Sequence, residues 1–143
     1  MDLREQLLKA INFAVNAHGD RKNKKGEPYI LHCFRVMNAG QTLEEKIVGM
    51  LHDVLKNTKV TIANLLTSDF SQELVDAVHT LTELENEELD HYIARIKRCD
   101  LATRVKLNKL IDNMDLRKLK VLADDDVMLL RRYLYIYNKL NDK

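Results

Sequence analysis

The candidate metal-binding side chains are His18 and His32, on either side of a basic loop, and the adjacent pair His52 and Asp53. Imidazole nitrogen and carboxylate oxygen together suit Mn²⁺, Fe²⁺ or Zn²⁺, and helical bundles build such sites between facing helices. Each residue also has an ordinary explanation. A lone histidine on an apolar stripe is more often a hydrogen-bonded core residue, and a His-Asp dipeptide also occurs by chance. The spacing alone therefore leaves metal binding open.

The helices expected around these residues decide whether they can meet. In a helix over residues 43–56, one side is apolar, and Gly49, His52, Asp53 and Lys56 recur on the other side at helical spacing. A glycine beside the His-Asp pair permits the close approach of another backbone. In a helix over 28–39, His32 shares a stripe with apolar residues and should face inward. Two such helices could bring His32, His52 and Asp53 to one ion.

The pattern of the whole chain predicts an all-α fold. One proline and four glycines leave little room for β-turns, and apolar residues recur at helical spacing nearly throughout. Pro28 fits the first turn of a helix, and Thr42, Thr61 and Ser71 are predicted to be helix caps. We predict a single domain over residues 1–143, a bundle of about eight helices. The expected helices span residues 2–17, 28–39, 43–56, 61–67, 71–81, 88–98, 100–117 and 124–140.

Composition narrows the class of protein. The chain is 45% hydrophobic and 31% charged, and its net charge of +1 gives no whole-molecule argument for binding nucleic acid or an anionic membrane. No apolar run approaches a membrane span, and the start, MDLREQLLKA, lacks a signal-peptide pattern. Cys33 and Cys99 have no close spacing and are expected to be reduced thiols. We therefore expect a cytoplasmic protein, and the sequence does not indicate an oligomeric state.

Several segments together resemble one known family. AHGDRKNKKGEPYILH, MLHDVLKNTKVT, VHTLTELE, YIARIKRCDLATRVKL and LIDNMDL occur in the order and spacing of the HD-domain phosphohydrolases. The similarity is greatest to small stand-alone relatives of the RelA/SpoT-type (p)ppGpp hydrolase domain, and it extends over nearly the whole chain. It implies an all-helical fold. It also implies a 3′-pyrophosphohydrolase of guanosine tetra- or pentaphosphate, in which one divalent ion, usually Mn²⁺, activates a water.

The resemblance also assigns roles to individual residues. His32, His52 and Asp53 match three of the family's metal ligands. Lys24 matches a basic residue of the nucleotide-facing loop, and Asn113 matches an asparagine that contacts substrate. Tyr29 belongs to the same motif as Lys24 and is expected to pack beneath the pocket.

The sequence departs from the family at the residues that complete the site. Lys109 stands where the family has its fourth metal ligand, an aspartate, and Lys56 and Asn57 replace an acidic pair that helps to activate water. An ammonium group near a divalent ion is repelled by it, and Lys109 could instead pair with Asp53. The alternative is that Lys109 extends to solvent and leaves a site of three ligands. Asp112, one turn later, is not expected to supply the fourth ligand.

Three functions remain open at this point. The first is a divergent HD-domain protein with weak or no hydrolase activity, in which no catalytic residue is assigned. It would bind a guanosine tetraphosphate-like nucleotide or phosphate in a positive pocket, with no metal. The second is an active Mn²⁺-dependent phosphohydrolase with a reduced ligand set. The third is a structural or regulatory interaction protein that has kept the fold and uses its outer surface.

Overall fold

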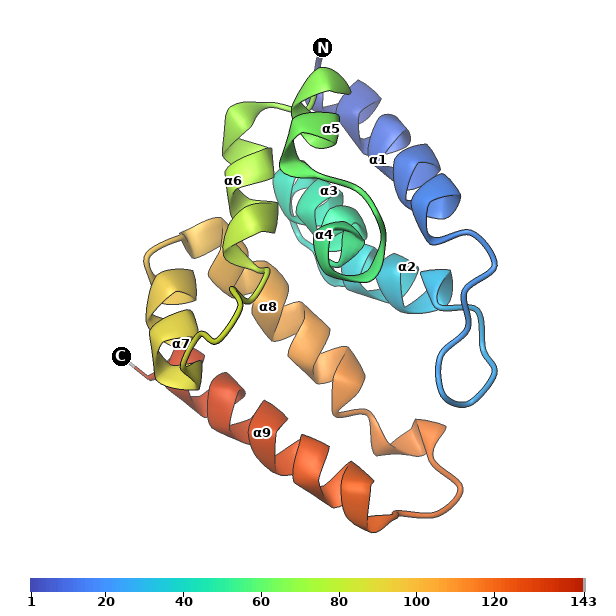
Figure 1. The fold of residues 1–143 in the computed structure, drawn as a ribbon, viewed down its shortest axis with the longest axis vertical. Helices are drawn as coiled ribbons and strands as arrows, with labels where there is room; N and C mark the ends of the chain where they lie inside the picture. The colour runs from blue at the N-terminus through green and yellow to red at the C-terminus, as the bar shows by residue number, and fades with distance from the viewer. Residues whose placement is uncertain (143) are drawn as a thin grey trace.

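Helices account for all the regular secondary structure in the computed structural model, which describes residues 1–142 (Figure 1). There are nine α-helices and one short 3₁₀ helix within that range. They are α1 (Leu3–His18), α2 (Ile30–Ala39), α3 (Leu43–Leu51), α4 (Val54–Asn57), α5 (Ile62–Thr67), α6 (Gln72–Thr80), α7 (Leu89–Lys97), α8 (Asp100–Asn113), η1 (Leu116–Lys118) and α9 (Asp124–Asn141). The predicted all-α architecture is confirmed.

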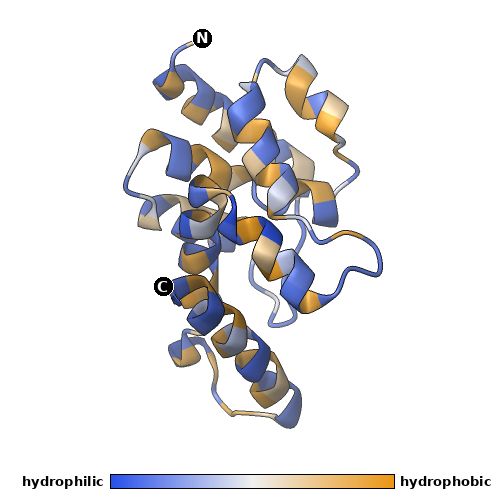
Figure 2. Cartoon of the chain, turned by 90° about the vertical axis from the view of Figure 1, so that its left-hand side faces the viewer, coloured by the Kyte–Doolittle hydropathy of each residue, from blue (hydrophilic) through white to orange (hydrophobic). Residues whose placement is uncertain are grey.

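Helix α3 lies at the centre of the fold. Its residues 47–51 are all buried, and α1, α2, α6 and α8 pack around it. One hydrophobic core joins side chains from Ala10 in α1 to Leu140 in α9. Figure 2 shows hydrophobic and hydrophilic residues interspersed along the helices, as in helices that bury one side. Most of the stability of such short helices comes from this packing.

The C-terminal part of the chain covers one side of the core. Helix α8 packs on α2, α3 and α6, and α9 runs along α8 and α7 (Figure 1). Over residues 1–142, no helix is both long enough and apolar enough to cross a membrane.

Several predicted helix starts are confirmed by their hydrogen bonds. Thr61 and Asn64 form a reciprocal capping box, and the Ser71 hydroxyl accepts a bond from the Leu74 amide. The Thr42 hydroxyl accepts from the Glu45 amide. The Glu45 carboxylate bonds the Thr42 hydroxyl rather than the Thr42 amide, so this cap has only one of the two bonds of a capping box.

The predicted helix over 43–56 is interrupted at the His-Asp pair. Helix α3 ends at Leu51 and α4 begins at Val54, while Asp53 has φ −109° and ψ 4°. The ring nitrogen Nδ1 of His52 lies 2.5 Å from the Gly49 carbonyl, which the Asp53 amide would use in a continuous helix. The histidine side chain therefore replaces a backbone bond, and the pair lies at a bend.

Two other boundaries differ from the prediction. Pro28 is not in the first turn of α2. It forms an isolated bridge with Lys22 across a tight loop, and the helix begins at Ile30. The predicted helix over 100–117 stops at Asn113, because Asp115 caps the separate 3₁₀ turn that follows.

Candidate functional site

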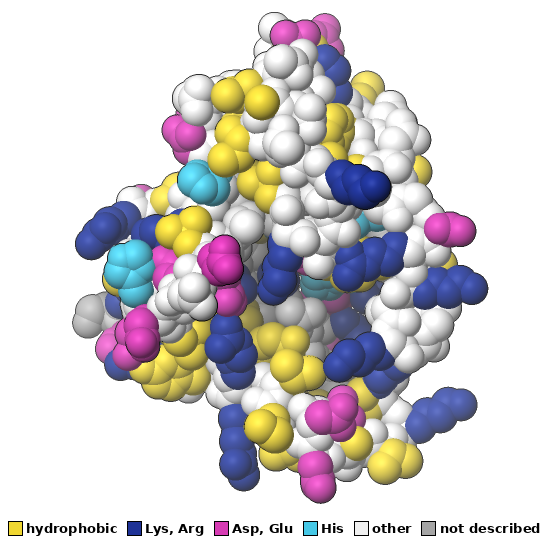
Figure 3. All heavy atoms as spheres, in the orientation of Figure 1, with side chains coloured by type: hydrophobic (Ala, Val, Ile, Leu, Met, Phe, Trp, Pro, Cys, Tyr) yellow, Lys and Arg dark blue, Asp and Glu magenta, His cyan; other side chains and the backbone are white. Residues whose placement is uncertain are grey.

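A cavity of about 520 Å³ opens between α2, the α3–α4 bend, α8 and α9. Eight lysine and arginine side chains and six aspartate and glutamate side chains line it, and α9 contributes an apolar wall that includes Leu129 and Tyr133. In Figure 3, lysine and arginine side chains surround a hollow in which histidine and acidic atoms are visible. Its size is in the range of small-molecule sites.

The three metal-type residues meet at this cavity. One ligand atom each from His32, His52 and Asp53 lies within 4.8 Å of the others. Gly49 makes the meeting possible, because a Cβ at this position would lie 3.2 Å from the Met37 backbone of α2. The close approach expected at Gly49 is therefore real, and it brings the two histidine rings to a centroid distance of 5.2 Å.

His52 presents one ring nitrogen to the site. Its Nδ1 faces the Gly49 carbonyl, so Nδ1 carries the proton and Nε2 has the free lone pair in the neutral ring. Nε2 is buried and has no hydrogen-bond partner among the described residues, although Asp53 Oδ2 lies 3.1 Å away. A buried nitrogen of this kind could accept a cation.

His32 is held by an ionic network on its other side. Its Nδ1 lies 2.6 Å from Asp112 Oδ2, and the same carboxylate receives Arg35 Nε at 2.7 Å and Lys118 Nζ at 2.9 Å. Burial lowers the pKa of His32 to about 4. Burial acts to raise the pKa of Asp112, but the hydrogen bonds from His32, Arg35 and Lys118 hold it below its usual range. Asp112 thus orients His32 and is not part of the three-residue group.

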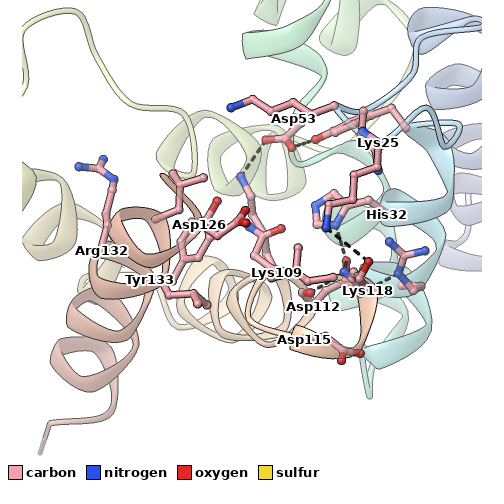
Figure 4. Close-up of a pocket in the computed structure, with 18 of the residues that line it drawn as sticks. Lys25, His32, Asp53, Lys109, Asp112, Asp115, Lys118, Asp126, Arg132 and Tyr133 are labelled. Carbon is pink, nitrogen blue, oxygen red and sulfur yellow. Dashed lines mark hydrogen bonds and ion pairs between the residues drawn. The ribbon is translucent and has the colours of Figure 1, made fainter. Parts of the chain in front are cut away.

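Asp53 is fully engaged by protein groups. Lys109 Nζ lies 3.0 Å from Oδ1 (Figure 4). The Tyr29 hydroxyl donates to Oδ2. Burial acts to raise the pKa of Asp53, but the charges of His52 and Lys109 hold it well below its usual value. Tyr29, predicted as a substrate-binding residue that packs beneath the pocket, bonds directly to the candidate metal ligand Asp53.

This arrangement does not fit a divalent ion. The described residues offer three donors, and one of the three is already paired with an ammonium group that would repel the ion. The Lys109 side chain is only 17% exposed, so it turns into the cavity rather than extending to solvent. As these side chains stand, one fixed positive charge balances Asp53.

The loop between α1 and α2 supplies the residues expected to face a nucleotide. The side-chain oxygen of Asn23 accepts bonds from the Lys25 and Glu27 amides, which fold the loop. Lys24 at the tip is exposed and lines the cavity. Lys25 also lines it and donates to the Lys118 carbonyl at 3.3 Å, which joins the loop to η1.

The remaining predicted residues fall into two groups. Asn113 and Lys56 line the cavity, and Lys56 is exposed. Asn57 does not line it. The Asn57 side chain donates to the Tyr29 hydroxyl at 3.4 Å instead.

Lys106 was missed in the sequence. It lies one turn before Lys109 on α8, is only 7% exposed and lines the cavity. The signal was available, because a residue three positions before Lys109 shares its side of the helix. The apolar neighbours Val105 and Leu107 obscured it.

Comparisons with known proteins agree with these features. The family model described as "HD domain" matches residues 10–143. A guanosine-3′,5′-bis(diphosphate) 3′-pyrophosphohydrolase of Aquifex aeolicus is 30% identical over 120 residues, which cover 78% of this chain. A probable enzyme of the same description from Mycoplasma pneumoniae is 28% identical over 106 residues, or 71% of the chain. The matches span only 17% and 14% of those longer relatives.

A solved structure has the same fold. It is described as a metazoan ortholog of SpoT that hydrolyzes ppGpp, and it superimposes with a TM-score of 0.78. The alignment covers 96% of this chain and 86% of the other, at 16% sequence identity. At that identity the likeness establishes the helical fold.

Proposed function

Because this chain belongs to the HD domain family, we propose that it is a divergent relative of the ppGpp 3′-pyrophosphohydrolases with weak or no hydrolase activity. Its cavity binds an anionic nucleotide or phosphate without a metal ion. One observation carries this proposal: the Lys109 ammonium is paired with Asp53 inside a cavity that remains open. The ammonium of Lys109, which is part of the protein, thus balances the charge of Asp53 as a bound metal ion would.

The charges of the cavity support anion binding. Asp53 and Asp112 are both neutralised by bonded cations, and Glu83 is paired with Arg132 at 2.7 Å. Four lysines of the lining have no carboxylate within ion-pair distance among the described residues. They are Lys24, Lys25, Lys56 and Lys106. Among the described residues, Glu27 and Asp126 are the lining acids without an ion pair, two against four lysines, so an excess of positive charge remains that would attract phosphate groups.

The residues that would activate water support weak or absent hydrolysis. Lys56 and Asn57 replace the acidic pair of the resembled enzymes, and neither can serve as a carboxylate general base. Asp53, the carboxylate nearest to them, is held by Lys109 and Tyr29. Within residues 1–142, neither the residues at the positions of the acidic pair nor Asp53 is therefore free to accept a proton from an attacking water.

Calorimetry on chelator-stripped protein tests the proposal. We expect no heat from Mn²⁺, and we expect guanosine tetraphosphate to bind in the presence of a chelator with an affinity that falls as salt rises. Lys24→Met and Lys56→Met should each weaken binding, whereas the matched control Lys59→Met, at an exposed lysine outside the cavity, should not. One-to-one Mn²⁺ binding that is lost in His52→Ala would overturn the proposal.

A second candidate is an active Mn²⁺-dependent phosphohydrolase with a reduced ligand set. The unpartnered Nε2 of His52 favours it, because this nitrogen is buried beside Asp53 with nothing to bond. It requires Lys109 to leave Asp53. Release of pyrophosphate from guanosine tetraphosphate that needs Mn²⁺ and is abolished in Asp53→Ala would establish this function.

A purely structural or regulatory role is the third candidate. It would gain support if the Lys109–Asp53 pair closed the pocket. The pair is present, but about 520 Å³ remains beside it, enough for a small ligand. The cavity therefore favours the binding function.

A further inference from the structure

Lys106 is a mostly buried lysine whose amine opens to the cavity and has no bonded partner among the described residues. Only 7% of the residue is exposed, and its Nζ makes no hydrogen bond or ion pair with any of the residues 1–142. Its contact is with the face of the Tyr92 ring, 5.2 Å from Nζ to the ring centroid. Buried lysines are nearly always paired, so an unpaired one that lines a cavity calls for a ligand.

The charged groups around Lys106 do not neutralise it. Lys109 and Lys56 add like charge. Asp53 and Glu83 are the acids nearby, but Asp53 is bonded to Lys109, and Glu83 is bonded to Arg132. Burial first, and then the charge of Lys109, lowers the pKa of Lys106 to about 7. The amine is therefore easily deprotonated when the cavity holds no anion.

We infer that Lys106 is the innermost anion-binding group of the cavity and that it takes up a proton when a phosphate or pyrophosphate group binds. The inference rests on the proposed function and identifies the chemistry of its deepest subsite. The bound anion supplies the negative charge that the protein does not, and the neutral amine becomes an ammonium paired with a phosphate oxygen. One proton passes from solvent to Nζ, and no covalent bond of the ligand changes.

The placement of the lysines specifies the ligand class. Lys106 and Lys109 are one turn apart on α8, so both ammonium groups reach the same part of the cavity, and Lys56 lines it from α4. Because Lys109 is already paired with Asp53, a singly charged carboxylate would leave this cluster positive. A phosphate with two or more negative charges matches it better.

Linkage gives the direction of the pH effect. A nearby anion raises the pKa of Lys106, so the complex holds a proton that the free protein loses above about pH 7. Affinity should therefore be nearly constant below that pH and fall as the pH rises above it. Calorimetric heats should also depend on the ionisation enthalpy of the buffer.

The experiment uses trimetaphosphate, whose charge is constant across the neutral range. Its affinity is measured by calorimetry at about pH 6 and about pH 8.5, in two buffers at each pH. We expect the wild-type affinity to fall by about tenfold or more between these values, with proton uptake. Lys106→Met should bind weakly at both, and Lys106→Arg should keep its affinity at the higher pH, because an arginine does not lose its proton. Lys59→Met should behave as wild type.

The outcomes separate the two proposals. Affinity that is independent of pH and unchanged in Lys106→Met would overturn the role of Lys106 and leave metal-independent anion binding intact. No binding of trimetaphosphate or guanosine tetraphosphate by wild type at either pH would overturn both. The folding of each variant is checked by circular dichroism, and Lys106→Arg keeps the test decisive if Lys106→Met fails to fold.

Discussion

The ammonium nitrogen of Lys109 lies 3.0 Å from Oδ1 of Asp53, and the two side chains come from α8 and from the bend between α3 and α4. The Tyr29 hydroxyl holds the other oxygen of the same carboxylate. A carboxylate that has the position of a metal ligand is thus the centre of a protein ion pair.

Replacing Lys109 by aspartate should create a divalent-metal site. The change removes the repelling ammonium and adds a fourth ligand beside His32, His52 and Asp53. We expect one-to-one Mn²⁺ binding by calorimetry where the wild type shows none. Lys109→Met is the control, because it removes the charge without adding a ligand and should bind more weakly than Lys109→Asp. If neither variant binds Mn²⁺, the shape of the cavity, rather than Lys109, excludes the metal.

Removing Lys109 should also destabilise the protein. The Asp53 side chain is 6% exposed, and Lys109→Met leaves its charge buried without its partner, so the free energy of unfolding should fall by about 3 kcal/mol at neutral pH. The pair lowers the folded-state pKa of Asp53, so its stabilisation is present above about pH 4 and lost as the pH falls through the folded value. Urea unfolding should show a large deficit at about pH 7 and a smaller one in acid.

A deficit of the same size at both pH values would contradict this origin. It would point to lost packing of the lysine stem instead. Lys120→Met, at an exposed lysine, is the matched control and should change the free energy of unfolding by no more than about 0.5 kcal/mol.

The sequence was sufficient to predict the helical fold and to predict that His32, His52 and Asp53 lie close together. Helical periodicity, with few turn residues, predicted most elements to within about two residues, because each short helix must bury one face. The inward direction of His32 followed from its apolar neighbours, and it is buried. The bend at His52 was not predictable from periodicity, because it arises from a ring nitrogen that bonds the Gly49 carbonyl.

The partners of the site residues could not be predicted in the same way. Asp112 lies 80 positions from His32, and only the packing of α8 on α2 brings its carboxylate to the ring. The sequence favoured the exclusion of Asp112 as a ligand but gave no role for it. Its spacing from Lys109 places Lys106 on the same side of the helix, but its burial depends on how α3, α7 and α9 pack around α8.

Asp112→Asn should loosen His32. The asparagine amide has one accepting oxygen in place of two, and it carries no charge. It therefore cannot accept from His32, Arg35 and Lys118 together, and the His32 ring loses its fixed partner at Nδ1. In the Lys109→Asp background we expect Mn²⁺ affinity to fall by roughly tenfold to a hundredfold. Asp115→Asn is the control, since Asp115 also lines the cavity but pairs with Arg117. Unchanged affinity in Asp112→Asn would show that packing alone orients His32.

Lys106→Met should change how stability depends on pH. The pKa of Lys106 is about 7 in the folded protein and about 10.4 when unfolded, so between these values the unfolded chain binds more protons and stability rises with pH. Below about pH 7 both states are protonated and the cost of the buried charge is complete. We expect Lys106→Met to be more stable than wild type at about pH 6, by on the order of 3 kcal/mol, with the gain shrinking toward pH 9. Denaturant unfolding of wild type and Lys106→Met at the two pH values measures this gain in the free energy of unfolding. A gain that does not vary with pH would refute the burial of a charged amine.

Gly49→Ala should separate the two histidines. A methyl group at this position would lie 3.2 Å from backbone atoms of Met37 and Val36, and backbone cannot move aside as a flexible side chain can. Helices α2 and α3 must move apart, at a cost of about 1–3 kcal/mol in the free energy of unfolding. The control is Asn38→Ala, at an exposed position of α2.

Moving the two helices apart should also move the two histidines apart, because His52 bonds the Gly49 carbonyl and His32 lies on α2. In the Lys109→Asp background, Gly49→Ala should therefore weaken Mn²⁺ binding as well as stability, whereas Asn38→Ala should affect neither. If Gly49→Ala lowers stability but leaves Mn²⁺ affinity intact, the histidines are positioned by their own hydrogen bonds, and the close packing of the two helices serves the fold alone.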